Sequence, residues 1–138
     1  MTPQAMAQLH ARCFTHTRPW GADEFAKLLA QDHIISLIKP YGFALVRMIA
    51  PESELLTIAI DPKQQGKGHG RALLKEVLAS AQQAGAQEMM LEVGENNRAA
   101  IALYEACGFC EISLRPKYYK LSNGDFCDAK IMHFAFSN

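Results

Sequence analysis

The chain has 138 residues, of which 49% are hydrophobic and 20% are charged. This is the size and composition of one globular domain with a single core, so we expect one domain over residues 1–138. Fourteen Lys and Arg residues balance fourteen Asp and Glu residues, which argues against direct nucleic-acid binding. The sequence shows neither a membrane-span-length apolar run nor a signal pattern at its start. We therefore expect a cytoplasmic protein with no membrane partner.

Apolar spacing and turn residues divide the chain into helices and strands. In chain order, the sequence predicts helices over 3–14 and within 17–32, strands over 33–39, 42–50 and 54–60, a glycine-rich loop, a helix from about 70 to 85, a strand over 87–93, a helix over 96–107, and strands over 109–115 and 129–136.

The order of these elements predicts an α/β (α+β) fold with a mixed sheet. Strands 54–60 and 87–93 flank one helix, so we expect them to be parallel neighbours joined by a right-handed crossover. The earlier strands read as an antiparallel meander. Helices therefore lie on both faces of the sheet.

Cys107 and Cys110 form a C-x-x-C pair, which raises the question of a redox or metal site. A redox pair normally opens a helix, whereas this pair follows one. A zinc site needs a second pair at matching spacing, and the sequence has none. We expect reduced thiols packed as small apolar residues, and no bound metal.

The segment QQGKGHGRALL (64–74) places three glycines and two cations before a predicted helix. The first N–H groups of a helix have no internal partners, and a glycine loop lets an anion approach them. The pattern matches neither the nucleotide P-loop nor the dinucleotide fingerprint. We expect a phosphate group as the ligand of this loop. The alternative is a glycine-rich turn without a ligand.

Two stretches in order, IAIDPKQQGKGHGRALL and LEVGENNRAAIALYEACGF, resemble the GNAT superfamily of N-acetyltransferases. The loop Gln65–Gly70 is similar to its acetyl-CoA loop, Gln/Arg-x-x-Gly-x-Gly/Ala. The second stretch is most similar to the RimI family of ribosomal-protein alanine N-acetyltransferases. The resemblance extends back to HARCF and RPW (10–20) and forward to KYYKLSNGDFCDAKIM (117–132).

The resemblance implies a GNAT-like splayed central sheet and acetyl-CoA as co-substrate. The family begins with a strand before its first helix, whereas this sequence begins with the predicted helix, so we expect the first strand to be missing. By resemblance, the loop backbone holds the pyrophosphate, the preceding strand pairs with the pantetheine arm, and an asparagine adds a contact. The residues concerned are Ile58, Ala59, Ile60, Gln65, Gly66, Lys67, Gly68, His69, Gly70, Arg71 and Asn97.

The catalytic residues implied by the resemblance are Glu92 as base and Tyr104 as acid. An amine attacks only when deprotonated, and a carboxylate at the end of a buried strand is partly desolvated, which strengthens it as a base. Asn97 and Tyr104 are seven residues apart and therefore share a helix face. The structural alternatives are a solvated carboxylate and a core tyrosine.

The acceptor site is implied less directly. Trp20 and Tyr119 either line a peptide groove or fill the core as aromatic residues. The function implied is transfer of an acetyl group, by direct attack, to the N-terminal α-amine of an Ala-like residue in a protein such as a ribosomal protein. A GNAT enzyme that acetylates a small amine and a non-catalytic acetyl-CoA-binding module are the alternatives.

Overall fold

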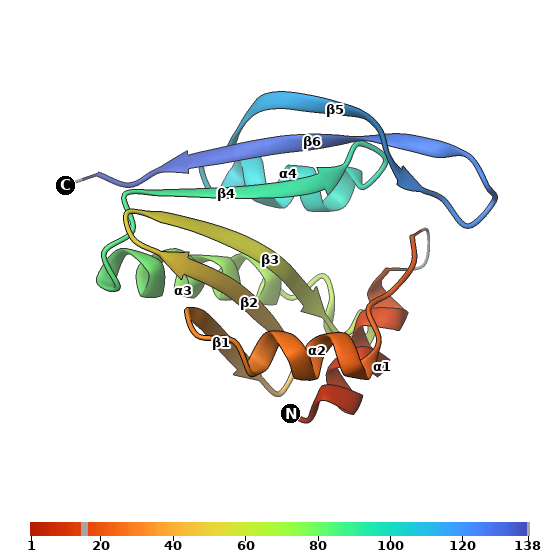
Figure 1. The fold of residues 1–138 in the computed structure, drawn as a ribbon, viewed down its shortest axis with the longest axis horizontal. Coiled ribbons are helices and arrows are strands. Elements are labelled where there is room, and N and C mark those ends of the chain that lie inside the picture. The colour runs from red at the N-terminus through yellow and green to blue at the C-terminus, as the bar shows by residue number, and fades with distance from the viewer. Residues whose placement is uncertain (15–16, 138) are drawn as a thin grey trace.

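The computed structural model describes residues 1–14 and 17–137 and contains a six-stranded sheet in the order β1-β2-β3-β4-β6-β5 (Figure 1). The elements in chain order are α1 (Pro3–Cys13), α2 (Ala22–Leu29), β1 (Ile34–Lys39), β2 (Gly42–Ile49), β3 (Glu52–Ile60), a 3-10 turn η1 (Pro62–Gln64), α3 (His69–Gln83), β4 (Glu88–Gly94), α4 (Arg98–Ala106), β5 (Cys110–Lys120) and β6 (Phe126–Ala135). The mixed α/β class is confirmed, and the described elements begin with a helix, as expected.

The sheet consists of two antiparallel parts that meet along one parallel seam. The strands β1, β2 and β3 form the first part, and β4, β6 and β5 form the second. The parallel pairing of β3 with β4 is confirmed, but it is limited to a single register position, Glu54 opposite Met90. Beyond it the two strands diverge, as Figure 1 shows, so the sheet is splayed.

Helices cover the two parts differently. The helices α1 and α2 pack on one face of β1–β3 around buried residues such as Met6, Phe25 and Phe43. On the opposite face, α3 and α4 pack against both parts of the sheet and include Leu73 and Ile101 in one continuous core. We call β1–β3 the closed half because it has helices on both faces. We call β4, β6 and β5 the open half because, among the described residues, no helix covers its second face.

The second helix lies within residues 17–32, as predicted, and begins after the turn residues of that segment. It starts at Ala22, because Pro19 and Gly21 hold the preceding segment extended. Glu24 stabilises this start by accepting a hydrogen bond from the Gly21 N–H at 3.1 Å and pairing with Arg18 at 2.7 Å. These contacts fix the segment between the first two helices on its α2 side.

The last two strands are longer than predicted. The strand predicted over 109–115 continues to Lys120, and its partner begins at Phe126 rather than 129. Pro116 and Lys117, which read as a loop, sit in an irregular stretch of an edge strand, where a proline removes no needed hydrogen bond. The hairpin therefore extends well beyond the seam.

All four cysteines are free. Cys127 is buried and Cys13 and Cys107 are half-buried, but Cys110 is exposed, so its expected packing as an apolar residue is wrong. A membrane-spanning helix would need more length and more apolar character than any helix of the described residues has.

Candidate active site

A cavity of about 1610 Å³ lies where β3 and β4 diverge, and most of the predicted site residues border it. The bordering residues from the prediction are Trp20, Ile58, Ile60, Gln65, Gly66, Gly68, His69, Gly70, Arg71, Glu92, Asn97, Tyr104 and Tyr119. Two predicted residues are not among them. The Ala59 side chain packs under α1 and α2, and the Lys67 ammonium donates to Gln64 Oε1 at 3.1 Å.

The glycine loop leaves its backbone open to the cavity. Gly66 and Gly68 have φ values of +78° and +81°, a region that favours glycine, and a Cβ at either position would meet nothing within 4 Å. Gly68 is the N-cap of α3 and provides no side-chain cap. The first N–H groups of α3 are therefore available to an anion. This geometry fits a phosphate group.

His69 has a structural contact within this loop. Its ring stacks on Tyr41 with the centroids 3.9 Å apart, which ties the start of α3 to the β1–β2 turn. His69 therefore has a packing role at the start of α3, in addition to its place on the cavity wall.

The end of β3 is already bonded on one side of the cavity. The carbonyl of Ile60 accepts hydrogen bonds from Cys13 Sγ at 3.1 Å and from Gln65 Nε2 at 3.2 Å. Between Leu55 and Ile60, however, β3 has β2 on one edge and, among the described residues, no paired strand on the other. This free edge is a place where an extended ligand could pair with the backbone.

Glu92 lies on β4 with its side chain 23% exposed, and it is ion-paired. Arg115 Nη1 is 3.1 Å from Glu92 Oε1, and the guanidinium also lies 5.1 Å from the centre of the Tyr118 ring. Glu92 is therefore partly removed from solvent, and it has in Arg115 a partner that the sequence did not indicate.

Tyr104 packs in the core and also borders the cavity. It is 8% exposed, and its ring packs 5.9 Å from that of Phe109. Burial, with a smaller contribution from Tyr119, raises the pKa of Tyr104 well above its usual value. Its hydroxyl therefore stays protonated at neutral pH and can serve as a proton donor.

Tyr119 and Asn97 complete the cavity wall near these two residues. Burial, and then the charge of Glu92, raises the pKa of Tyr119 to about 12, so its hydroxyl is also protonated. Asn97 caps α4, with Oδ1 accepting the Ala100 N–H at 3.2 Å. Its amide nitrogen is the group that remains for a ligand.

His10 and Thr57 are among the residues of the cavity wall that had no predicted role. His10 is 3% exposed, lies against the rings of Phe14 and Trp20, and accepts the Trp20 backbone N–H at Nδ1. Burial lowers the pKa of His10 to about 4, so it is neutral. Thr57 lies on β3 among apolar residues, which gave no signal in the sequence.

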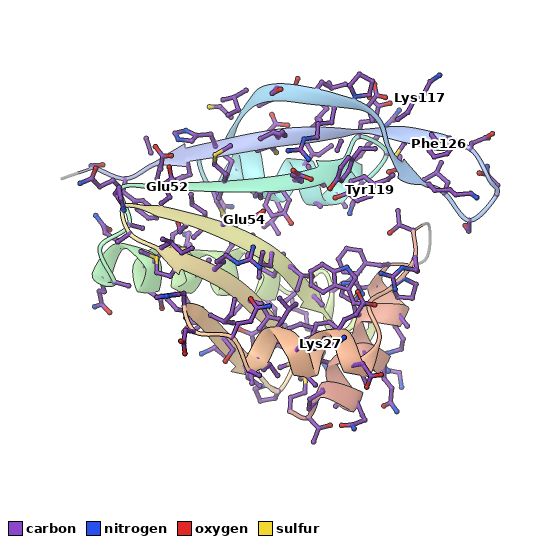
Figure 2. The ribbon with its side chains drawn as sticks, in the orientation of Figure 1. Lys27, Glu52, Glu54, Lys117, Tyr119 and Phe126 are labelled. Atoms are coloured by element: carbon purple, nitrogen blue, oxygen red, sulfur yellow. The ribbon has the colours of Figure 1, made fainter. Side chains whose placement is uncertain are left out.

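A second cavity of about 320 Å³ lies on the uncovered face of the sheet and shares Leu91 and Glu92 with the first. It extends from Glu92 toward Glu52 and Glu54 on β3. Figure 2 shows Glu52 and Glu54 along the seam and Tyr119 on the other half of the sheet. Space therefore continues from the candidate base along the surface.

Comparison with known proteins gives one family and several similar chains. A model described as the acetyltransferase (GNAT) family matches residues 4–109. The [Ribosomal protein bS18]-alanine N-acetyltransferase of Escherichia coli is 34% identical over 127 residues, covering 89% of this chain and 86% of that one. The N-alpha-acetyltransferase RimI of Mycobacterium tuberculosis is 36% identical over 131 residues, covering 88% and 81%.

The same similarity is present in three dimensions. The crystal structure of the ribosomal-protein-S18-alanine N-acetyltransferase from Escherichia coli superposes with a TM-score of 0.87 at 33% identity, covering 99% of this chain and 88% of that chain. The match includes the splayed sheet on which the cavity is built.

Proposed function

The chain belongs to the acetyltransferase (GNAT) family and is an N-acetyltransferase, and from this premise we propose that its acceptor is the α-amine of a protein N-terminus with an Ala-like first residue, such as that of a ribosomal protein. GNAT acetyltransferases use acetyl-CoA as co-substrate. The observation that carries the proposal is that the glycine loop, Glu92 and Tyr104 all border one cavity. The named relatives support the choice of acceptor.

We assign the binding of acetyl-CoA to the loop and to the free edge of β3. The backbone from Gly66 to Arg71 would hold the pyrophosphate, because its N–H groups and the α3 dipole favour an anion. The edge of β3 from Ile58 to Ile60 would pair with the pantetheine arm, and the Asn97 amide would add one contact. When bound, acetyl-CoA would supply an acetyl thioester. The acceptor nitrogen forms a bond to the acetyl carbonyl carbon, the bond from that carbon to sulfur breaks, and the sulfur leaves as a thiolate.

Side chains of the protein carry out the two proton transfers. Glu92 takes a proton from the acceptor nitrogen, and Arg115 holds the Glu92 carboxylate in place through Oε1. Tyr104 gives its hydroxyl proton to the departing sulfur, a role that a buried, fully protonated tyrosine can fill. Trp20 and Tyr119 would form walls for the acceptor chain.

A peptide acceptor has room beyond its first residue. The smaller cavity continues from Glu92 along the uncovered face of the sheet, where several residues of an extended chain can lie. A small amine needs no such extension. This is the observation that favours the peptide over the small-amine alternative.

An acceptor screen tests the proposal. The protein is incubated with acetyl-CoA and with pools of peptides or small amines, including Ala-starting peptides and polyamines, and the products are read by mass. We expect acetylation at the α-amine of Ala-starting peptides. Glu92→Gln should lower kcat, and its deficit should shrink as pH rises past about 8, where the α-amine is already free. Turnover of polyamines alone would contradict the proposed acceptor.

A further inference from the structure

Thr57 carries a buried hydroxyl with no hydrogen-bond partner in the part of the chain that the structure describes, residues 1–14 and 17–137. The residue is 7% exposed and borders the cavity. A buried hydroxyl without a partner is destabilising, and folded proteins seldom keep one without a functional reason. Among the described residues, the other two buried polar side chains, His10 and Ser53, each have a partner.

The strand register brings Thr57 to the same height as Glu92 across the seam. The two strands run parallel from their single paired position, Glu54 opposite Met90. Glu92 lies two residues beyond Met90, and Thr57 lies three beyond Glu54. A bulge in β3, where the register passes from Leu55 to Thr57, takes up the extra residue. The two residues therefore stand at corresponding positions on facing strands.

Both side chains also lie on the same face of the sheet. Thr57 is directly opposite Leu45, which packs under α1 and α2. Glu92 alternates with Leu91 and Val93, which pack on the α3 and α4 side, so its side chain is on the α1 and α2 side. Thr57 and Glu92 thus approach the cavity from opposite walls of the seam.

A threonine at a cavity wall can turn its hydroxyl into the cavity. Rotation about χ1 moves the hydroxyl and the methyl group between staggered positions. In Thr57 this rotation breaks no hydrogen bond, because Oγ1 has no partner among the described residues. The hydroxyl is therefore free to turn toward an incoming ligand.

We propose that Thr57 Oγ1 accepts a hydrogen bond from the acceptor amine and, together with Glu92, selects a primary amine. A primary amine has two N–H groups and one lone pair. With one N–H directed to the Glu92 carboxylate and the other to the Thr57 hydroxyl, the lone pair is left free for reaction. This inference rests on the proposed acetyl transfer and adds a specificity residue to it. A secondary amine has one N–H and can satisfy only one of the two groups.

The test compares Thr57→Val, which removes the hydroxyl, with Thr57→Ser, which keeps it. The acceptors are an Ala-starting peptide and the same peptide with its α-nitrogen methylated. We expect Thr57→Val to lower kcat/KM for the first peptide by about 10- to 100-fold. The preference for the unmethylated peptide should shrink by a similar factor, because the valine enzyme has already lost the second acceptor group. Thr57→Ser should keep both the rate and the preference.

Two further measurements separate this role from a structural one. The melting temperature of Thr57→Val without ligands should equal or exceed that of the wild type, because an unpaired buried hydroxyl is removed. Its affinity for acetyl-CoA, measured by thermal shift, should be unchanged. Ser53→Ala is the matched control: its hydroxyl donates to the Glu88 carbonyl at 2.7 Å, so its loss should lower the melting temperature and leave the preference intact.

Three results would overturn the inference. The first is an unchanged kcat/KM in Thr57→Val. The second is a loss of acetyl-CoA affinity as large as the loss of kcat/KM, which would assign the hydroxyl to the co-substrate. The third is a lower melting temperature with full activity, which would assign it to a structural water. If the wild type acetylates only small amines, the proposed acceptor fails instead, and the same comparison is made with that amine and its N-methyl derivative.

Discussion

The closed and open halves of the sheet differ in how completely their side chains are buried. Residues Phe43 to Val46 on β2 are all buried, because helices cover both faces of that strand. In contrast, Cys110 to Tyr118 on β5 are all exposed, and large apolar side chains such as Ile112 and Phe126 remain in contact with solvent. The same sheet is therefore a sealed core at one end and an accessible surface at the other.

The candidate site lies where these two environments meet. The closed half contributes the free edge of β3 and Thr57, which are held by packing from both sides. The open half contributes Glu92 and Tyr119, which a large acceptor can reach over the uncovered face. The closed half therefore supplies rigidity to the site, and the open half supplies access for the acceptor. Four changes test this division.

The largest effect is expected from Tyr104→Phe, on α4 at the wall of the larger cavity. The change removes only a hydroxyl, so packing and acetyl-CoA binding should be kept. If Tyr104 is the acid, kcat should fall by about 10²–10⁴ in steady-state assays. Tyr118→Phe is the control, because Tyr118 is 49% exposed on the open half and has no proposed proton transfer. Equal kcat values for the two variants would remove the acid role.

The next prediction compares how much stability is lost when a phenylalanine is truncated to alanine in each half of the sheet. Phe25 is the fully buried residue of α2, and Phe25→Ala should lower the free energy of unfolding by about 3–5 kcal/mol. Phe126 is 56% exposed in the open half, and Phe126→Ala should change it by less than about 0.5 kcal/mol. Denaturant unfolding measures both. Similar losses would mean that the open half is covered in solution.

The third effect is a pH dependence that belongs to the closed half. The folded pKa of His10, about 4, lies below its unfolded value of 6.5, so protons bind preferentially to the unfolded chain. The stability that depends on neutral His10 is complete above pH 6.5 and declines as pH falls toward 4, by about 3 kcal/mol in total. Urea unfolding across this range measures the slope.

His10→Asn is the variant that isolates this slope. An asparagine oxygen can accept the Trp20 N–H but does not titrate. We expect the variant to lose stability less steeply between pH 6.5 and 4 than the wild type. An identical slope in both proteins would show that other groups control acid unfolding.

The smallest effect concerns the glycine loop, which is the phosphate end of the proposed site. At 100 times the dissociation constant, acetyl-CoA should stabilise the wild type by about 2.7 kcal/mol, seen as a rise in melting temperature. Gly68→Asp places a carboxylate where the phosphates would lie and should abolish the rise. Gly124→Asp, at a similar positive φ in the β5–β6 turn, should keep it. Loss of the rise in both variants would point to general damage rather than to the loop.

Much of the fold could be predicted because its boundaries are set by local residues. Gly85 and Gly108 end α3 and α4 with φ values of +100° and +104°, which the sequence indicated by glycine alone. The β5–β6 hairpin was predicted too short because Pro116 and Lys117 read as a loop. The structure instead carries β5 through these two residues as an irregular stretch of an edge strand, and β5 pairs with β6 again at Tyr119 and Lys120.

The candidate site, too, could be predicted where it depends on local sequence and not where it depends on contacts between distant strands. The loop and the spacing of Asn97 and Tyr104 could be found because they lie on continuous stretches of chain. The Arg115 partner of Glu92 and the position of Thr57 could not, because the first depends on pairing across β6 and the second on a bulge and a seam register. Neither relation has a trace in the local sequence.

The free edge of β3 has a consequence for amide hydrogen exchange. In a strand that pairs on one edge only, every second backbone N–H group is hydrogen-bonded to the neighbouring strand, and the N–H groups between them face solvent. Exchange along Leu55 to Ala59 should therefore alternate between slow and fast sites. On the proposed mode of binding, acetyl-CoA would slow the fast ones. The sheet would then be continuous across the seam only while the co-substrate is in place, and each catalytic cycle would close and reopen it.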